Sequence, residues 1–206
     1  MFARCGAWMG LVGADGPNSP GEDLTLPRLF TGLELPSEIA AELATLRGGV
    51  SGARWIGKED YHITLRFIGD IDERIAGEAA DALGEIRRPS FPVAIDGVSW
   101  FGGDKPRAIV AMIKPTAALM ELQADQERRL RRIGLSPETR KYTPHVTLAR
   151  LRSASPYAVA DYLSARGYFR DRQFEATRFV LFSARESMGG GPYLVEAAYA
   201  LQGSDG

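Results

Sequence analysis

The chain has 206 residues, of which 45% are hydrophobic and 25% charged, and its formal net charge is −1. This composition is typical of a globular protein and excludes a collagen-like repeat, a coiled coil or a disordered chain. The near-zero net charge argues against a protein that coats nucleic acid with bulk positive charge. Arginine supplies 21 of the 25 cationic residues, so local phosphate-binding sites stay open.

Residues 1–27 form a Gly-, Pro- and Asp-containing segment that carries Cys5, the only cysteine. Its short apolar run is broken by glycine and lacks the cleavage site of an export signal. No apolar run approaches the roughly 18 residues that cross a membrane, and a single cysteine forms no internal disulfide, which favours the cytoplasm. We therefore expect a flexible extension over 1–27 and one monomeric domain over 28–206, with no membrane partner.

Hydrophobic periodicity predicts five elements in the first half of the chain. They are a strand over 27–35, a helix that begins at Pro36, a strand over 60–69, a helix that begins with the capping pair Asp70 and Glu73, and a strand over 91–101. The two helices are predicted from apolar residues at helical spacing, namely Ile39, Leu43, Leu46, Ile75, Ala79, Leu83 and Ile86.

The second half begins the same order again. It predicts a strand over 107–113, a helix from Pro115 and Thr116 to Gly134, a strand over 145–151, a helix from Ser155 to about Arg166, and a hairpin of two strands within 174–187 and 192–201. The helix-opening prolines lie 79 residues apart and the two histidines 83 apart. We infer two related halves around a pseudo-twofold axis, in an α+β fold with a ligand cleft between two lobes.

Both histidines of the chain occur in one pattern. Residues 61–70 read YHITLRFIGD and residues 142–150 read YTPHVTLAR, so each histidine is followed by threonine two places later and then by leucine. A single histidine on a strand is usually a packing or surface residue. Threonine makes up only nine of the 206 residues, so both pairings arise by chance in about 0.2% of cases. The repeat therefore indicates function.

Alternate side chains of a strand share a face, which predicts His62, Thr64 and Arg66 on one polar face and His145 with Thr147 on another. In-line attack on a phosphodiester needs one neutral imidazole as a base and one protonated imidazole as an acid. Histidine allows both forms because its ordinary pKa is near 6.5. Threonine hydroxyls donate hydrogen bonds to phosphate oxygens. The two motifs together predict phosphodiester chemistry.

Other phosphate and metal chemistries fit the sequence less well. A zinc site needs three or four ligands, whereas the chain has two histidines, one cysteine and no acidic cluster beside either motif. The glycine-rich stretches WFGGDKP and MGGGP lack the Gly-Lys-Ser/Thr ending of a P-loop. We therefore expect no catalytic metal and no cofactor.

The paired motifs resemble those of the two-histidine phosphoesterase superfamily, in its RNA 2′,3′-cyclic phosphodiesterase (2′-5′ RNA ligase) branch. The resemblance extends over about residues 28 to 200 and includes RLFTGLELP, RWIGKEDYHITLRFIGD, KPRAIVAMI and YTPHVTLAR. It implies a bilobal fold of antiparallel-rich sheets around a central cleft, with helices outside. It also implies metal-independent opening of 2′,3′-cyclic phosphate ends of RNA, and the reverse reaction as 2′-5′ ligation.

Carried over by position, the resemblance implies His62 as the acid, His145 as the base, and Thr64, Thr147 and Arg150 as phosphate-binding residues. The direction of proton transfer stays open, because the two halves are symmetric in sequence.

Strand alternation alone leaves several residues uncertain in role. It places Arg150 out of phase with His145, so a bulge or the end of the strand has to reorient it. It places Arg66 in phase with His62, as a residue of the cleft wall, and Phe67 in the core. Four aromatic residues are further candidates for stacking on a base: Trp55, Tyr61, Trp100 and Phe101.

Two alternative functions stay open at this point. One keeps the cleft and changes the substrate to 2′-5′ oligonucleotides or the cyclic phosphate of ADP-ribose. The other is a module that binds RNA ends or nucleotides without turnover. Retention of both histidines and both threonines argues against the module, because binding alone does not require a paired acid and base.

Overall fold

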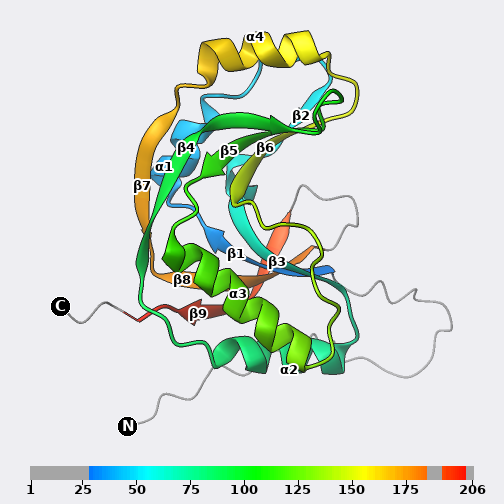
Figure 1. Cartoon of the computed structure of the whole chain (residues 1–206), viewed down its shortest axis with the longest axis vertical. Coiled ribbons are helices and arrows are strands. Elements are labelled where there is room, and N and C mark those ends of the chain that lie inside the picture. Colours follow the sequence, from blue (N-terminus) through cyan, green and yellow to red (C-terminus); the bar gives the residue numbers. More distant parts are fainter. Residues whose placement is uncertain (1–27, 185–191, 203–206) are drawn as a thin grey trace, which may run out of the picture.

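The computed structural model describes residues 28–184 and 192–202. The expectations for residues 1–27, for Cys5 and for the turn at 188–191 fall outside the described residues. The elements, in chain order (Figure 1), are β1 (Arg28–Glu34), α1 (Ser37–Ala44), β2 (Ala53–Trp55), the 3₁₀ helix η1 (Lys58–Asp60), β3 (His62–Asp70), α2 (Glu73–Gly84), β4 (Phe91–Phe101), β5 (Ala108–Ile113), α3 (Ala117–Arg132), β6 (His145–Leu151), α4 (Pro156–Arg166), β7 (Arg170–Ala176), β8 (Arg178–Ala184) and β9 (Tyr193–Ala200).

The strands follow the order β7-β4-β5-β6-β3-β1-β8-β9, with β2 added beside β6, and the strand pairs are antiparallel. This order is symmetric about the boundary between β6 and β3. Each of these two motif strands has a partner from a βα unit, β5 or β1, and then two outer strands. The structure thus confirms the α+β class and the pseudo-twofold relation of two lobes.

The two lobes exchange strands, which the sequence did not predict. The first half of the chain supplies β4, but β4 pairs with β5 and β7 in the lobe of the second motif. The last two strands, β8 and β9, return to the lobe of the first motif and extend the sheet beyond β1. Each lobe is therefore completed by chain from both halves.

The segment 174–187 was predicted as one strand of a hairpin, and that prediction is wrong in part. Thr177 separates two strands, because β7 pairs with β4 while β8 pairs with β1 and β9. The two strands differ in burial: β7 is an exposed edge strand, whereas β8 is buried between neighbours on both sides. The predicted hairpin is β8 with β9.

The helices begin where their capping residues place them, with one correction. The first turn of α2 is capped by Asp72, whose carboxylate accepts a hydrogen bond from the Ile75 amide (2.9 Å). The predicted cap, Asp70, instead ends β3 and forms an ion pair with Arg28 (3.2 Å). Thr116 caps α3 as predicted, and Ser155 caps α4 with Pro156 in the first turn.

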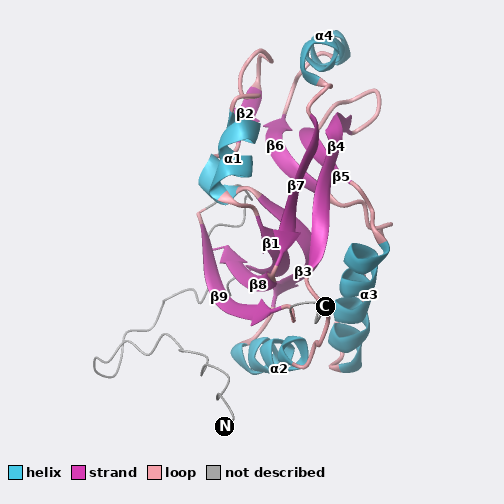
Figure 2. Cartoon of the chain, turned by 90° about the vertical axis from the view of Figure 1, so that its left-hand side faces the viewer, coloured by secondary structure: helices cyan, strands magenta, loops and turns pink. Residues whose placement is uncertain are grey.

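The helices lie at the periphery of the strands, with α4 at one end of the long axis and α2 at the other (Figure 2). Their apolar faces pack onto the sheet through residues buried in one cluster, including Leu43, Leu83, Leu119, Leu130 and Val159. Among the described residues, no helix is long and apolar enough to span a membrane. The helices support the sheet from behind and leave the opposite side of the motif strands to the cleft.

Candidate active site

Each motif strand carries a β-bulge directly after its threonine. Between β1 and β3 the register runs from Gly32–Thr64 to Thr31–Arg66, which leaves Leu65 without a partner of its own. Between β5 and β6 it runs from Val110–Thr147 to Ile109–Ala149, which leaves out Leu148. A bulge shifts the alternation of all later side chains by one place.

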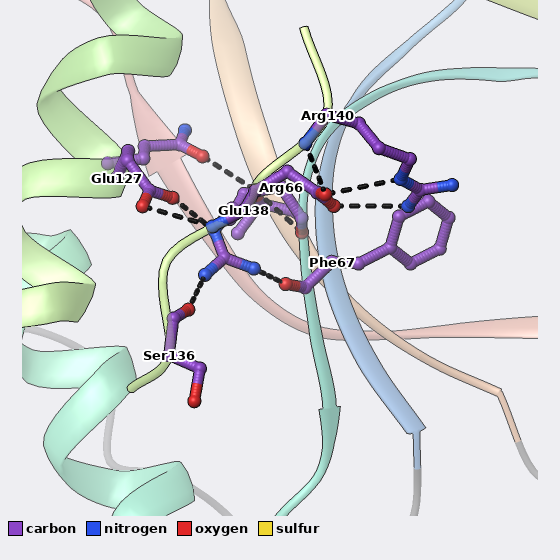
Figure 3. A network of polar contacts seen from close by, with 8 residues as sticks. Arg66, Phe67, Glu127, Ser136, Glu138 and Arg140 are labelled. Carbon is purple, nitrogen blue, oxygen red and sulfur yellow. Dashed lines mark hydrogen bonds and ion pairs between the residues drawn. The ribbon is translucent and has the colours of Figure 1, made fainter. Parts of the chain in front are cut away.

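The first bulge overturns the predicted directions of Arg66 and Phe67. Arg66 is 6% exposed, and its guanidinium binds Glu127 of α3 (2.5 Å) and the carbonyl oxygens of Phe67 and Ser136 (Figure 3). Phe67 is 44% exposed and borders the cleft. Arg66 contributes to the cleft wall as expected, but its charge is already neutralised by Glu127. Its role is to connect β3 to α3 and to the loop that follows α3.

The second bulge reorients Arg150 towards the cleft, as the sequence pattern required of a bulge or the end of the strand. Ala149 takes the buried position, and Arg150 is exposed and lines the cleft with His145 and Thr147. Arg150 thus occupies, in the second lobe, the place that Phe67 occupies in the first. The cleft measures about 970 Å³ and is also lined by His62 and Thr64. All five residues expected in the site therefore border one cavity.

The register between the two lobes brings the motifs against each other. Ile63 of β3 pairs with Val146 of β6, and both side chains are fully buried. Their neighbours point to the opposite side of the sheet. In an antiparallel pair those neighbours face one another, so His62 lies towards Thr147 and His145 towards Thr64. The two motifs therefore meet at this residue pair, and their histidines and threonines line one cleft.

Both imidazoles are held by the backbone in the same way. Nδ1 of His62 donates a hydrogen bond to the carbonyl oxygen of Asp60 (2.8 Å), and Nδ1 of His145 donates to that of Thr143 (2.7 Å). A carbonyl oxygen only accepts, so the proton of each neutral ring is on Nδ1. Nε2 of each ring therefore accepts a proton when the ring is neutral and donates one when the ring is charged.

The two rings have different surroundings. The His62 ring lies among Phe30 (4.9 Å between centroids), Tyr193 (5.0 Å) and Phe182 (5.6 Å). Among the residues that the structure describes, the His145 ring meets one aromatic side chain, Phe101, edge-on at 4.7 Å. His62 is therefore the more enclosed of the two by apolar groups.

Burial disfavours the charged form of both rings. It lowers the pKa of His62 to about 4; the Asp60 carbonyl opposes this change, and the positive charges of His145 and Arg150 add to it. Burial also lowers the pKa of His145, with the Thr143 carbonyl opposing and Arg150 adding to the change. In the free protein at neutral pH, both imidazoles are therefore neutral.

Of the four candidates for stacking on a base, Phe101 lines the cleft. Tyr61 is buried in the core, as strand alternation places it, and Trp55 packs against Tyr162. Trp100 is exposed and donates its indole hydrogen bond to the Gly103 carbonyl (3.2 Å). The sequence reasoning also missed several residues that line the cleft, namely Phe30, Arg54, Phe67, Arg152 and Tyr193. The bulge hid Phe67, and no local pattern pointed to the others.

Within the described part of the chain, no three His, Cys, Asp or Glu side chains gather in a group that could share one metal ion. The acidic residues at the cleft are Asp60 and Glu138, and Glu138 hydrogen-bonds to Arg140 (3.1 Å; Figure 3).

Comparison with known proteins identifies the family. The model of the LigT-like phosphoesterase family matches residues 33–110 and 113–193, and each range contains one histidine motif. The chain belongs to the LigT-like phosphoesterase family. The two separate ranges support the duplication inferred from the offsets of the histidines and prolines.

Relatives with assigned names agree with this placement in the family. An RNA 2′,3′-cyclic phosphodiesterase of Aeropyrum pernix is 34% identical over 56% of this chain and 69% of its own length. One of Geobacillus stearothermophilus is 32% identical over 59% of this chain, but only 41% of its own length is matched. The crystal structure of Escherichia coli LigT complexed with 3′-AMP has a TM-score of 0.68 at 24% identity, and the match covers 85% of this chain and 98% of that one. This likeness shows the common fold.

Proposed function

We propose that this protein hydrolyses 2′,3′-cyclic phosphate at RNA 3′ ends and leaves a 2′-phosphomonoester, without a metal ion. One observation carries the proposal: two imidazoles border a single cleft together with two threonines and an arginine. Nδ1 of each imidazole is bound to a backbone carbonyl, so Nε2 is the atom that can exchange a proton with a ligand. The names of the relatives supply the substrate class.

His145 acts as the base and His62 as the acid in this proposal. The oxygen of a water molecule bonds to phosphorus while the bond from phosphorus to O3′ breaks. The proton of the water passes to Nε2 of His145, and the proton on Nε2 of His62 passes to O3′. Thr64, Thr147 and Arg150 donate hydrogen bonds to the two non-bridging oxygens, where charge increases in the transition state.

Because the pKa of His62 is lowered, this ring can act as the acid only when bound substrate favours its charged form. An acid must carry a proton, yet burial favours the neutral His62 ring in the free protein. A bound cyclic phosphate brings one negative charge beside the ring, which raises the pKa of an imidazole. Substrate binding therefore supplies the charge that keeps the acid protonated.

The test is an assay of the pure protein in EDTA with nucleoside 2′,3′-cyclic phosphates and with 2′-5′ dinucleotides. We expect a 2′-phosphate product from the cyclic substrate; a 3′-phosphate product or a requirement for metal contradicts the proposal. Hydrolysis of the 2′-5′ dinucleotide alone indicates the alternative substrate, and tight binding without turnover indicates a binding module.

Variants tested in the same assay show whether each histidine takes part in catalysis. His62→Ala and His145→Ala should each lower kcat by about 100-fold or more, and the double variant should lose little further, because both act in one step. Circular dichroism and urea unfolding show whether each variant is folded. A folded single variant with unchanged kcat removes that histidine from the mechanism.

A further inference from the structure

The end of the cleft between β2 and β6 carries three arginines. Arg54 of β2 is paired directly with Arg150 of β6, and Arg152 follows two residues later along the chain. All three line the cleft. Residues directly opposite each other in an antiparallel pair have Cα atoms about 4.5–5.5 Å apart. The arginines therefore form a row on one wall, which begins with Arg150, three residues after Thr147.

Arg54 and Arg150 bring two like charges together at this end of the cleft. Like charges directly opposite each other on neighbouring strands destabilise a sheet. Within 28–184 and 192–202, Arg150 and Arg152 form no ion pair, whereas Arg66 and Arg140 of the same cleft each have an acidic partner. The charge of Arg150 also lowers the pKa of both imidazoles. Arg150 thus faces the reacting phosphate, and Arg54 and Arg152 extend the positive wall away from it.

One cyclic phosphate cannot use all of these donors. It carries a single negative charge and two non-bridging oxygens, for which Thr64, Thr147 and Arg150 already supply hydrogen bonds. The guanidiniums of Arg54 and Arg152, each a fork of donors suited to a phosphate, lie beyond this set on the same wall. A second phosphate fits these two side chains.

The pseudo-twofold axis shows that this end of the cleft is specialised. Arg150 and Phe67 occupy equivalent places after the two bulges, yet one is a cation and the other an exposed aromatic ring. Phe67 lies 5.8 Å from Phe30, which also contacts His62 and Tyr193. The place after the first bulge is therefore aromatic and the place after the second is cationic, which makes the cleft asymmetric.

We propose that Arg54 and Arg152 bind the backbone phosphate that precedes the terminal nucleoside of an oligoribonucleotide. The preferred substrate is then an RNA end with at least one internucleotide phosphate, rather than a cyclic mononucleotide. This inference rests on the proposed function, because it takes the reacting group to be a cyclic phosphate between His62 and His145. An RNA chain that ends in a 2′,3′-cyclic phosphate continues only in the 5′ direction. The next phosphate along it is therefore the internucleotide phosphate on the 5′ side of the terminal nucleoside, which is the one assigned to Arg54 and Arg152.

The experiment compares a nucleoside 2′,3′-cyclic phosphate with a trinucleotide that ends in the same cyclic nucleotide. Arg54→Gln and Arg152→Gln should lower kcat/KM for the trinucleotide about tenfold more than for the mononucleotide. Arg150→Gln should lower both to a similar extent. The matched control is Arg132→Gln on α3, an exposed arginine outside the cleft, which should leave both values unchanged.

A binding measurement separates this subsite from the proposed function. Fluorescence anisotropy with a labelled trinucleotide that ends in 2′-phosphate needs no turnover. Each Arg→Gln variant should weaken its binding and reduce the slope of log K against log salt by about 0.7. Weakened binding in a protein that hydrolyses neither substrate supports the subsite and overturns the proposed function. Equal losses on both substrates, no loss on either, or no binding by the unchanged protein overturns the subsite.

Discussion

At the scale of the residue, two backbone carbonyls and a few aromatic rings determine how the histidines ionise. The Asp60 and Thr143 carbonyls fix the tautomer, and they favour the charged ring because they accept from Nδ1. Desolvation is stronger, so the pKa of each ring is lowered in spite of this hydrogen bond. His62, with its aromatic neighbours, is the ring whose pKa falls to about 4.

These shifts predict how the two rings titrate. Below its pKa a ring is protonated, so the acid form of His62 disappears as the pH of the free protein rises through about 4. We expect NMR titration to show the imidazole signals of both histidines changing below pH 6.5, with His62 the lower. Adding a nucleoside 2′-phosphate should raise both pKa values, since an anion favours the charged ring. The prediction is wrong if either ring of the free protein titrates at or above pH 6.5.

At the scale of the element, the paired β-bulges decide which side chains enter the cleft. They place Arg150 in it and turn Arg66 towards α3, although both follow a motif with the same sequence pattern. Glu127 binds Arg66 and also accepts a hydrogen bond from the Glu138 amide (3.2 Å; Figure 3). This network fixes the loop after α3, whose Thr143 holds His145.

The buried ion pair predicts a stability difference between two arginines. Arg66→Met leaves the Glu127 carboxylate without its main partner, in a place where its side chain is 18% exposed. We expect a decrease of about 3 kcal/mol in the free energy of unfolding, because an uncompensated buried charge is costly. The control is Arg74→Met, which removes the exposed pair with Glu78 and should cost less than about 1 kcal/mol. Urea unfolding measures both, and equal losses contradict the structural role of Arg66.

At the scale of the whole molecule, the exchange of strands makes each lobe depend on both halves of the chain. β4 has its partners, β5 and β7, in the second half, and β8 has its partner β1 in the first. The cleft lies between β3 and β6, which pair at Ile63 and Val146. The site therefore forms only when both halves are folded together.

This dependence predicts how the chain behaves when it is divided in the β4–β5 turn, between Gly103 and Asp104. Each piece alone exposes strand edges that are paired in the intact protein, so we expect neither to unfold cooperatively. Mixing the two pieces should restore cooperative unfolding, and restore hydrolysis if the proposed function holds. Circular dichroism and urea unfolding are the measurements. Cooperative unfolding of residues 1–103 alone would show that the first lobe does not need β8 and β9.

The sequence by itself determined the four described helices, most of the strands, the duplication and the two motifs, because hydrophobic period, capping residues and local spacing are properties of neighbouring residues. It missed β2 and the division of one predicted strand into β7 and β8. It also predicted that Arg150 needs a bulge or the end of the strand to enter the cleft, but not that a bulge directs the Arg66 guanidinium to Glu127. Both bulged residues, Leu65 and Leu148, are ordinary strand residues without a glycine or proline signal. Only the tertiary structure decided the bulges, the strand exchange and the arginine row, because pairing between distant strands sets the register, and register sets where each side chain points.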